Sequence, residues 1–132
     1  MQRPSLLIAV VEDEASVRKA LGRLLRSAGL GADTYASGEE FLEALPSRLP
    51  DCLLLDWRLP GMNGLAVQAR LREYNLKLPV VFITATGDLA ASKQALQSGA
   101  TAWLDKPVDD RVLLETIAQA LPGHEFLPGL LD

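Results

Sequence analysis

Short runs of apolar residues, separated by longer segments of mixed polarity, set the pattern of this chain. Three of these runs are too brief for helices and contain almost no polar side chains: 5–11, 52–55 and 79–83. Apolar runs of this length are typical of strands that are covered on both faces, as in a parallel sheet. Two weaker segments, 32–35 and 101–104, also predict short strands.

The segments between these runs predict helices, because their apolar residues recur at helical spacing. The helices are expected at 17–28, 38–45, 65–74 and 89–98, and from Asp109 or Asp110 to Leu121. Strand therefore alternates with helix throughout, which argues for a parallel sheet with right-handed crossovers and helices on both faces. We predict an α/β, doubly wound fold in one domain.

Local signals refine two of these helices. Ser37-Gly38-Glu39-Glu40 has the form of a capping box, which predicts that a helix begins directly after Ser37. In the helix at 65–74, the spacing of Leu65, Ala69 and Leu71 predicts that these three residues face inward.

Polar residues that chemistry uses follow four of the predicted strands. Glu12 and Asp13 follow the first run, Asp56 the central one, and Thr84 and Lys106 the last two. Because the carboxyl ends of parallel strands share one edge of the sheet, these residues converge there. Crowded carboxylates repel one another unless a cation compensates them, and oxygen ligands without His or Cys favour Mg²⁺. With a lysine and a hydroxyl added, the pattern indicates a site for a phosphoryl group.

Each of these residues also has an ordinary structural interpretation. A carboxylate at a strand end is usually a solvated turn residue, and Glu12-Asp13-Glu14 alone is more often charge at a helix N-terminus. Thr84 alone is more often a turn hydroxyl, and Lys106 alone a surface lysine. Their joint placement, each beside the end of its own strand, favours the site.

Composition narrows the class of protein further. The chain has 132 residues, 48% of them hydrophobic, and a net charge of −4, which gives no general reason to bind nucleic acid or an anionic membrane. Its single cysteine, Cys52, lies in a buried run, which predicts a core residue and a reducing, cytoplasmic setting. The apolar run before Glu12 is too short to span a bilayer.

Four motifs resemble, in the same order, the signatures of the response-regulator receiver domain of two-component signalling. They are V-V-E-D-E, L-L-L-D-W-R-L-P-G-M-N-G, V-V-F-I-T-A and S-G-A-T-A-W-L-D-K-P. The run I-T-A-T-G-D is similar to the FixJ-like branch of that family. The resemblance implies a CheY-like (flavodoxin-like) (βα)5 three-layer sandwich with sheet order 2-1-3-4-5. It implies a receiver domain at 1–121, and 122–132 is expected to be a tail or the start of a linker.

The resemblance also implies a role for each matching residue. The expected phosphoacceptor is Asp56. The expected ligands of Mg²⁺, or of Mn²⁺ in its place, are Glu12, Asp13, Asp56 and the backbone carbonyl of Arg58. The expected phosphoryl-binding and switch residues are Thr84, Ala85, Lys106 and Trp103. Arg58 and Thr86 are expected to modulate dephosphorylation, and the Lys106–Pro107 peptide bond is expected to be cis.

Trp103 departs from the family pattern, which usually has Tyr, Phe or His there, and its larger indole puts the usual aromatic rotamer switch in question. The resemblance implies a signalling phosphoacceptor rather than an enzyme, with a sensor histidine kinase as phosphodonor. The helix at 89–98, the strand at 101–104 and the last helix would form the regulated surface. That surface would serve a homodimer, or a C-terminal DNA-binding output domain that this chain lacks; the receiver itself would bind neither nucleic acid nor membrane.

Three other functions are compatible with an acid at a strand end. A phosphatase with an aspartyl nucleophile commonly needs a second acid two residues later, where this chain has Arg58. A nucleotide- or flavin-binding module needs a glycine-rich loop after the first strand, where this chain has Glu12-Asp13-Glu14. A degenerate receiver that acts only as a scaffold has no need of the full set of site residues found here.

Overall fold

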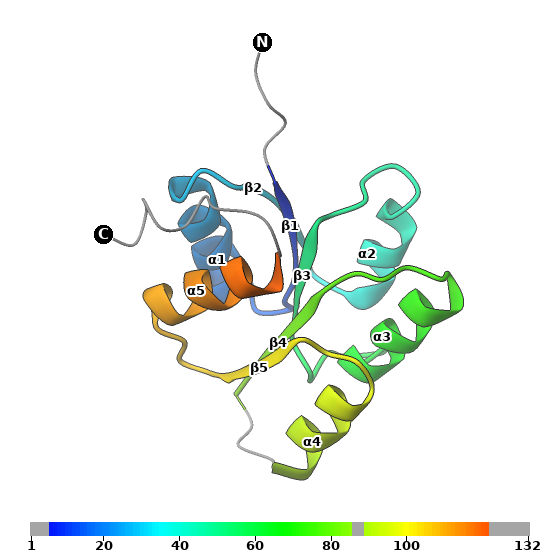
Figure 1. Cartoon of the computed structure of the whole chain (residues 1–132). Helices are drawn as coiled ribbons and strands as arrows, with labels where there is room; N and C mark the ends of the chain where they lie inside the picture. Colours follow the sequence, from blue (N-terminus) through cyan, green and yellow to red (C-terminus); the bar gives the residue numbers. More distant parts are fainter. Residues whose placement is uncertain (1–5, 86–88, 122–132) are drawn as a thin grey trace.

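A computed structural model describes residues 6–85 and 89–121 of the chain. In these ranges five strands alternate with five helices (Figure 1). The elements are β1 (Leu7–Val11), α1 (Ala15–Ser27), β2 (Gly31–Tyr35), α2 (Gly38–Ala44), β3 (Cys52–Leu55), α3 (Gly64–Glu73), β4 (Val80–Thr84), α4 (Leu89–Gln97), β5 (Ala102–Asp105) and α5 (Asp110–Ala120). All strand pairs are parallel, and the sheet order is β2-β1-β3-β4-β5, which confirms the predicted fold.

The sheet is the middle of three layers (Figure 1). Helices α1 and α5 cover one face, and α2, α3 and α4 cover the other. Because side chains alternate along a strand, Ile8 and Val10 of β1 enter the first core, whereas Ala9 and Val11 enter the second. Both faces are buried, so the central strands need apolar residues at successive positions. None of the helices in the described ranges has the length and hydrophobicity that crossing a membrane requires.

Side-chain caps begin α2, α3 and α5. The sequence predicts the caps of α2 and α5, and at the start of α3 Asn63 Oδ1 accepts the N–H of Ala66 at 2.9 Å. The hydroxyl of Ser37 accepts the backbone N–H of Glu40 at 3.1 Å. The Glu40 carboxylate returns to the N–H of Ala36 at 3.0 Å, one residue before the position that a standard capping box uses. At the start of α5, Asp109 Oδ1 accepts the N–H of Arg111 at 2.8 Å.

The buried face of α3 differs from the prediction. Ala69, which was expected to face inward, is exposed, whereas Val67 and Leu71 are buried. Gly64 decides this orientation, because its backbone lies directly against the sheet: a Cβ there would be 2.7 Å from Phe82 Cε1. Residues three and seven positions later share that side of the helix.

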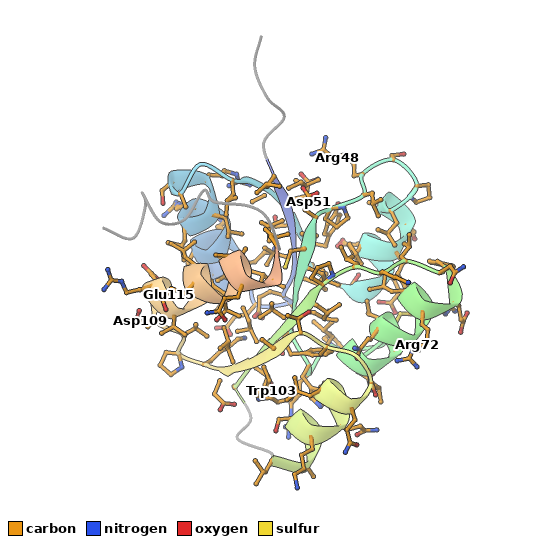
Figure 2. All side chains as sticks on the ribbon, viewed as in Figure 1. Arg48, Asp51, Arg72, Trp103, Asp109 and Glu115 are labelled. Carbon is orange, nitrogen blue, oxygen red and sulfur yellow. The ribbon has the colours of Figure 1, made fainter. Side chains whose placement is uncertain are left out.

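Helix α4 has few apolar anchors. Its buried residues are two alanines, Ala91 and Ala95. Beyond its last turn, the Ser98 carbonyl accepts hydrogen bonds from two side chains of α3, Gln68 Nε2 at 3.2 Å and the guanidinium of Arg72 (labelled in Figure 2). Polar contacts with α3 therefore hold the C-terminal end of this helix.

Candidate functional site

The five polar residues singled out at strand ends lie at one edge of the sheet. Glu12 and Asp13 follow β1, Asp56 follows β3, Thr84 is the last residue of β4, and Lys106 follows β5. The sheet order places β1 beside β3, β3 beside β4, and β4 beside β5. Residues separated by more than 90 positions therefore meet at a single site, as the hydrogen bond from Lys106 to Glu12 shows.

Three carboxylates form the centre of this site. One oxygen each from Glu12, Asp13 and Asp56 lies within 4.8 Å of the other two. Glu12 and Asp56 are only 2% and 6% exposed, whereas Asp13 is exposed. The cluster is therefore closed to solvent at Glu12 and Asp56 and open to solvent at Asp13.

Lys106 supplies a positive charge from β5. Its ammonium nitrogen lies 2.5 Å from Glu12 Oε1 and 3.2 Å from Asp56 Oδ2. Between β5 and β3 in the sheet lies β4, whose last residue, Thr84, is fully buried. Three ionised carboxylates against one ammonium group leave two negative charges uncompensated, which suits a divalent cation. Carboxylate and carbonyl oxygens are the ligands that Mg²⁺ prefers, so the donor set fits this metal.

The ionisation of these groups follows from burial and charge. Burial raises the pKa of Glu12, and the negative charge of Asp56 adds to this, although the hydrogen bond from Lys106 opposes it. Burial by itself would lower the pKa of Lys106, but its contacts with Glu12 and Asp56 outweigh burial and raise that pKa. Lys106 thus stays protonated, and burial disfavours the negative charge on Glu12 even with the Lys106 ammonium group in contact.

Backbone contacts orient Asp56. Its N–H donates to the Val11 carbonyl at 3.0 Å, which continues the β1–β3 pairing by one residue. Its Oδ1 then accepts the N–H of Arg58 at 3.0 Å. The two carboxylate oxygens of Asp56 therefore have different neighbours, a backbone amide at Oδ1 and Lys106 at Oδ2.

Comparison with known proteins decides the family. The response regulator receiver domain matches residues 8–118, which is most of the chain. The chain belongs to this family. Receiver domains of this family are signalling domains of two-component response regulators rather than conventional enzymes.

Individual relatives agree with the FixJ-like resemblance. Nodulation protein W of Bradyrhizobium diazoefficiens is 39% identical over 114 residues, which cover 86% of this chain and 50% of that protein. A response regulator receiver protein from Burkholderia phymatum is 47% identical, with a TM-score of 0.79 over 88% of this chain and 94% of that one. The FixJ-N crystal structure is 30% identical, with a TM-score of 0.83 over 95% and 98% of the two chains. The chain spans a quarter to about half the length of the curated relatives that it matches.

Within this receiver domain, Arg18 contacts the backbone of the acid pair, which the sequence did not reveal. Its Nη1 donates to the backbone carbonyl of Glu12 at 2.8 Å and to that of Asp13 at 3.3 Å. The only available signal was a basic residue in the second turn of the helix that follows the acid pair. Basic residues on exposed helix faces are too common for that signal to be specific.

Trp103 of the receiver belongs to β5, and its side chain lies on the side of the sheet that α4 covers (Figure 2). Its ring centroid is 5.3 Å from that of Trp57 and 5.8 Å from that of Phe82. Its indole N–H donates to Asp105 Oδ1 at 3.1 Å. Trp103 is therefore half-buried, with one edge in an aromatic cluster and its polar atom bonded at the surface.

The remaining predicted residues have simpler positions. Ala85 is exposed directly after Thr84. The Lys106–Pro107 peptide bond is cis, which confirms the prediction made from the receiver family. Thr86, predicted to modulate dephosphorylation, lies outside the described residues.

Proposed function

We propose that Asp56 is the phosphoacceptor of this receiver domain, and that a sensor histidine kinase is its phosphodonor. The observation that carries the proposal is the set of contacts around Asp56. The carboxylate is buried at a strand end, lies within 4.8 Å of two other acids, and receives the Lys106 ammonium at 3.2 Å. A structural ion pair needs no third acid, whereas a site for a metal ion and a phosphoryl group does.

The residues that would hold Mg²⁺, or Mn²⁺ in its place, are Glu12, Asp13, Asp56 and the backbone carbonyl of Arg58. The clustering of three carboxylate oxygens supports this set, and the exposure of Asp13 leaves room for the waters that Mg²⁺ usually retains. When bound, the ion would offset the charge on the phosphoryl oxygens.

The reaction is a transfer between two nucleophiles. An oxygen of Asp56 attacks the phosphorus of the donor phosphohistidine, so an O–P bond forms as the N–P bond breaks, and the imidazole nitrogen leaves with the electron pair. Lys106, which bonds Asp56 Oδ2 beforehand, remains within reach of the new phosphoryl oxygens. Thr84 supplies a hydroxyl from the neighbouring strand, and the small Ala85 beside it leaves the approach open.

Hydrolysis of the acyl phosphate returns the receiver to its first state. Arg58 is exposed two residues after Asp56, and its backbone N–H donates to Asp56 Oδ1. On the basis of the family resemblance, we propose that Arg58 and Thr86 control the rate of this hydrolysis. The receiver unit extends over 1–121, with 122–132, which lies outside the described residues, as a tail or linker.

The surface of α4, β5 and α5 is the output of the switch in this proposal. Weak apolar anchoring of α4 supports it, because an element with little packing energy moves at low cost. The partner is a second copy of the receiver, or a C-terminal DNA-binding domain such as a longer regulator carries. The setting is cytoplasmic, as the family resemblance implies.

Phosphorylation of the purified chain tests the central claim. Incubation with acetyl phosphate and Mg²⁺ should add a single base-labile phosphoryl group to the intact mass, and Asp56→Asn should abolish it while keeping the fold. Continuous release of phosphate at a high rate would indicate the phosphatase alternative instead. A native chain that gains no mass, or an Asp56→Asn chain that still gains it, would contradict the assignment.

Metal binding has its own test. Trp57 lies next to Asp56 in the chain, so its fluorescence should report a Mg²⁺ titration. Asp13→Asn should remove the response, whereas Glu14→Gln, which removes the same charge from an exposed acid in the same loop, should retain it. A titration that Asp13→Asn leaves unchanged would place the metal elsewhere.

The output surface is tested by sedimentation with and without beryllofluoride, a mimic of the bound phosphoryl group. Beryllofluoride should shift the native chain toward a dimer, and Trp103→Ala should weaken that dimer if the half-buried indole is an anchor. A chain that stays monomeric would remove the dimer from the proposal. A dimer that Trp103→Ala does not weaken would remove only Trp103.

A further inference from the structure

The guanidinium group of Arg18 lies against the backbone that carries two of the three clustered acids. Arg18 is in the first half of α1 and is half-buried. Its Nη1 lies 2.8 Å from the carbonyl oxygen of Glu12 and 3.3 Å from that of Asp13. Arg18 therefore bonds the main chain of these residues and leaves their carboxylates facing the site.

Few other contacts hold this part of the backbone. The N–H of Glu12 donates to the Tyr35 carbonyl at 3.0 Å, and beyond it the chain leaves the sheet. The N–H of Glu14 donates to Glu12 Oε2 at 3.1 Å, but Glu14, the N-cap of α1, makes no side-chain capping bond. No backbone N–H of another described residue donates to the carbonyls of Glu12 or Asp13.

We propose that Arg18 is a positioning residue for the metal site. By joining two successive carbonyls to α1, it fixes the turn in which the carboxylates of Glu12 and Asp13 point toward Asp56. The inference rests on the metal binding proposed above. The positive charge of Arg18 by itself repels a cation and would lower the affinity for Mg²⁺. Any gain in metal affinity from Arg18 must therefore come from geometry.

Two substitutions separate geometry from charge. Arg18→Lys keeps the charge, but its side chain is one bond shorter and lacks the guanidinium Nη1 that bonds both carbonyls, whereas Arg18→Gln removes the charge as well. If position matters, both variants should raise the Kd for Mg²⁺ by about tenfold, the lower end of the range for groups that orient metal ligands. If only charge matters, Arg18→Lys should resemble the native chain and Arg18→Gln should bind Mg²⁺ more tightly.

Two control variants in α1 complete the experiment. Lys19→Gln removes a neighbouring exposed charge and should leave the Kd for Mg²⁺ near the native value. Leu24→Ala removes a partly buried side chain that packs on the core six residues after Arg18 in α1, so it should lower stability without changing that Kd. Tryptophan fluorescence reports the Mg²⁺ titration, and thermal unfolding without Mg²⁺ verifies that each variant is folded.

The outcomes are distinct. A similar rise in Kd for both Arg18 variants, with neither control affected, would support the positioning role. A native Kd in Arg18→Lys, or tighter binding in Arg18→Gln, would overturn it, and Arg18→Lys decides alone if the glutamine variant does not fold. A native chain that binds no Mg²⁺ would overturn the metal centre itself, which is a failure of the proposed function and not of Arg18 alone.

Discussion

Replacing Lys106 with methionine tests how charge is balanced in the site. The change keeps most of the side-chain volume but removes the ammonium group, which lies 2.5 Å from Glu12 and 3.2 Å from Asp56. Both carboxylates are nearly inaccessible to solvent, at 2% and 6% exposure. In the absence of a metal ion, the variant therefore leaves two buried acids close together without their cation.

The size of the effect follows from this geometry. Removing one partner of a buried ion pair usually costs about 3–5 kcal/mol, but the Lys106 side chain is 19% exposed, so water screens part of the interaction. We expect Lys106→Met to lower the free energy of unfolding by about 2 kcal/mol near neutral pH. Adding Mg²⁺ should restore part of this loss, because a ligand that binds only the folded chain stabilises it.

The loss should also depend on pH. The pKa of Glu12 is already above its ordinary value of 4.5, and losing the hydrogen bond from Lys106 raises it further. An acid whose pKa is higher in the folded chain binds more protons when folded, so its effect on stability becomes less favourable as pH rises. The deficit of Lys106→Met should therefore be largest at about pH 7 and smaller at about pH 5, where Glu12 is closer to accepting a proton.

Urea unfolding of the native chain and of Lys106→Met, at both pH values and with and without Mg²⁺, measures these differences. Lys77→Met serves as the control, since Lys77 is exposed and makes no ion pair among the described residues. If Lys106→Met is no less stable than Lys77→Met at neutral pH, or if its deficit is the same at both pH values, the charge-balance argument is wrong.

Three further predictions concern single residues. Gly64→Ala should lower stability by about 1–3 kcal/mol, because its Cβ would lie 2.7 Å from Phe82 Cε1; an unchanged urea midpoint would contradict that close packing. Burial raises the pKa of Cys52 from 9.0 to about 12, so iodoacetamide should alkylate Cys52 only after unfolding, and rapid labelling of the native chain would refute this. The stability that the neutral thiol contributes should decline above pH 9.0, because the thiol then ionises in the unfolded chain but not in the folded one. Arg48→Ala should leave the unfolding midpoint nearly unchanged, because the ion pair with Asp33 is exposed, and a large shift would show that the pair matters more than its exposure implies.

Much of this receiver could be predicted from local sequence patterns. A strand that is buried on both faces needs successive apolar residues, and the turn that follows it needs polar ones, so strand ends such as Asp56 are visible in the sequence. A side chain that can accept a backbone N–H marks the start of a helix, as Ser37 and Asp109 do. These features depend on neighbours in the chain, and the family resemblance then supplied the strand order.

The contacts between elements depended on the tertiary structure instead. Periodicity favoured Ala69 as a core residue of α3, but the close approach of the Gly64 backbone to Phe82 turned that helix to bury Val67. In the same way, no local pattern distinguishes Arg18, which bonds the carbonyls behind the acid cluster, from the exposed basic residues beside it. Helix rotation and long side-chain reach are set by packing among residues distant in sequence, and a single sequence read along its length does not contain those distances.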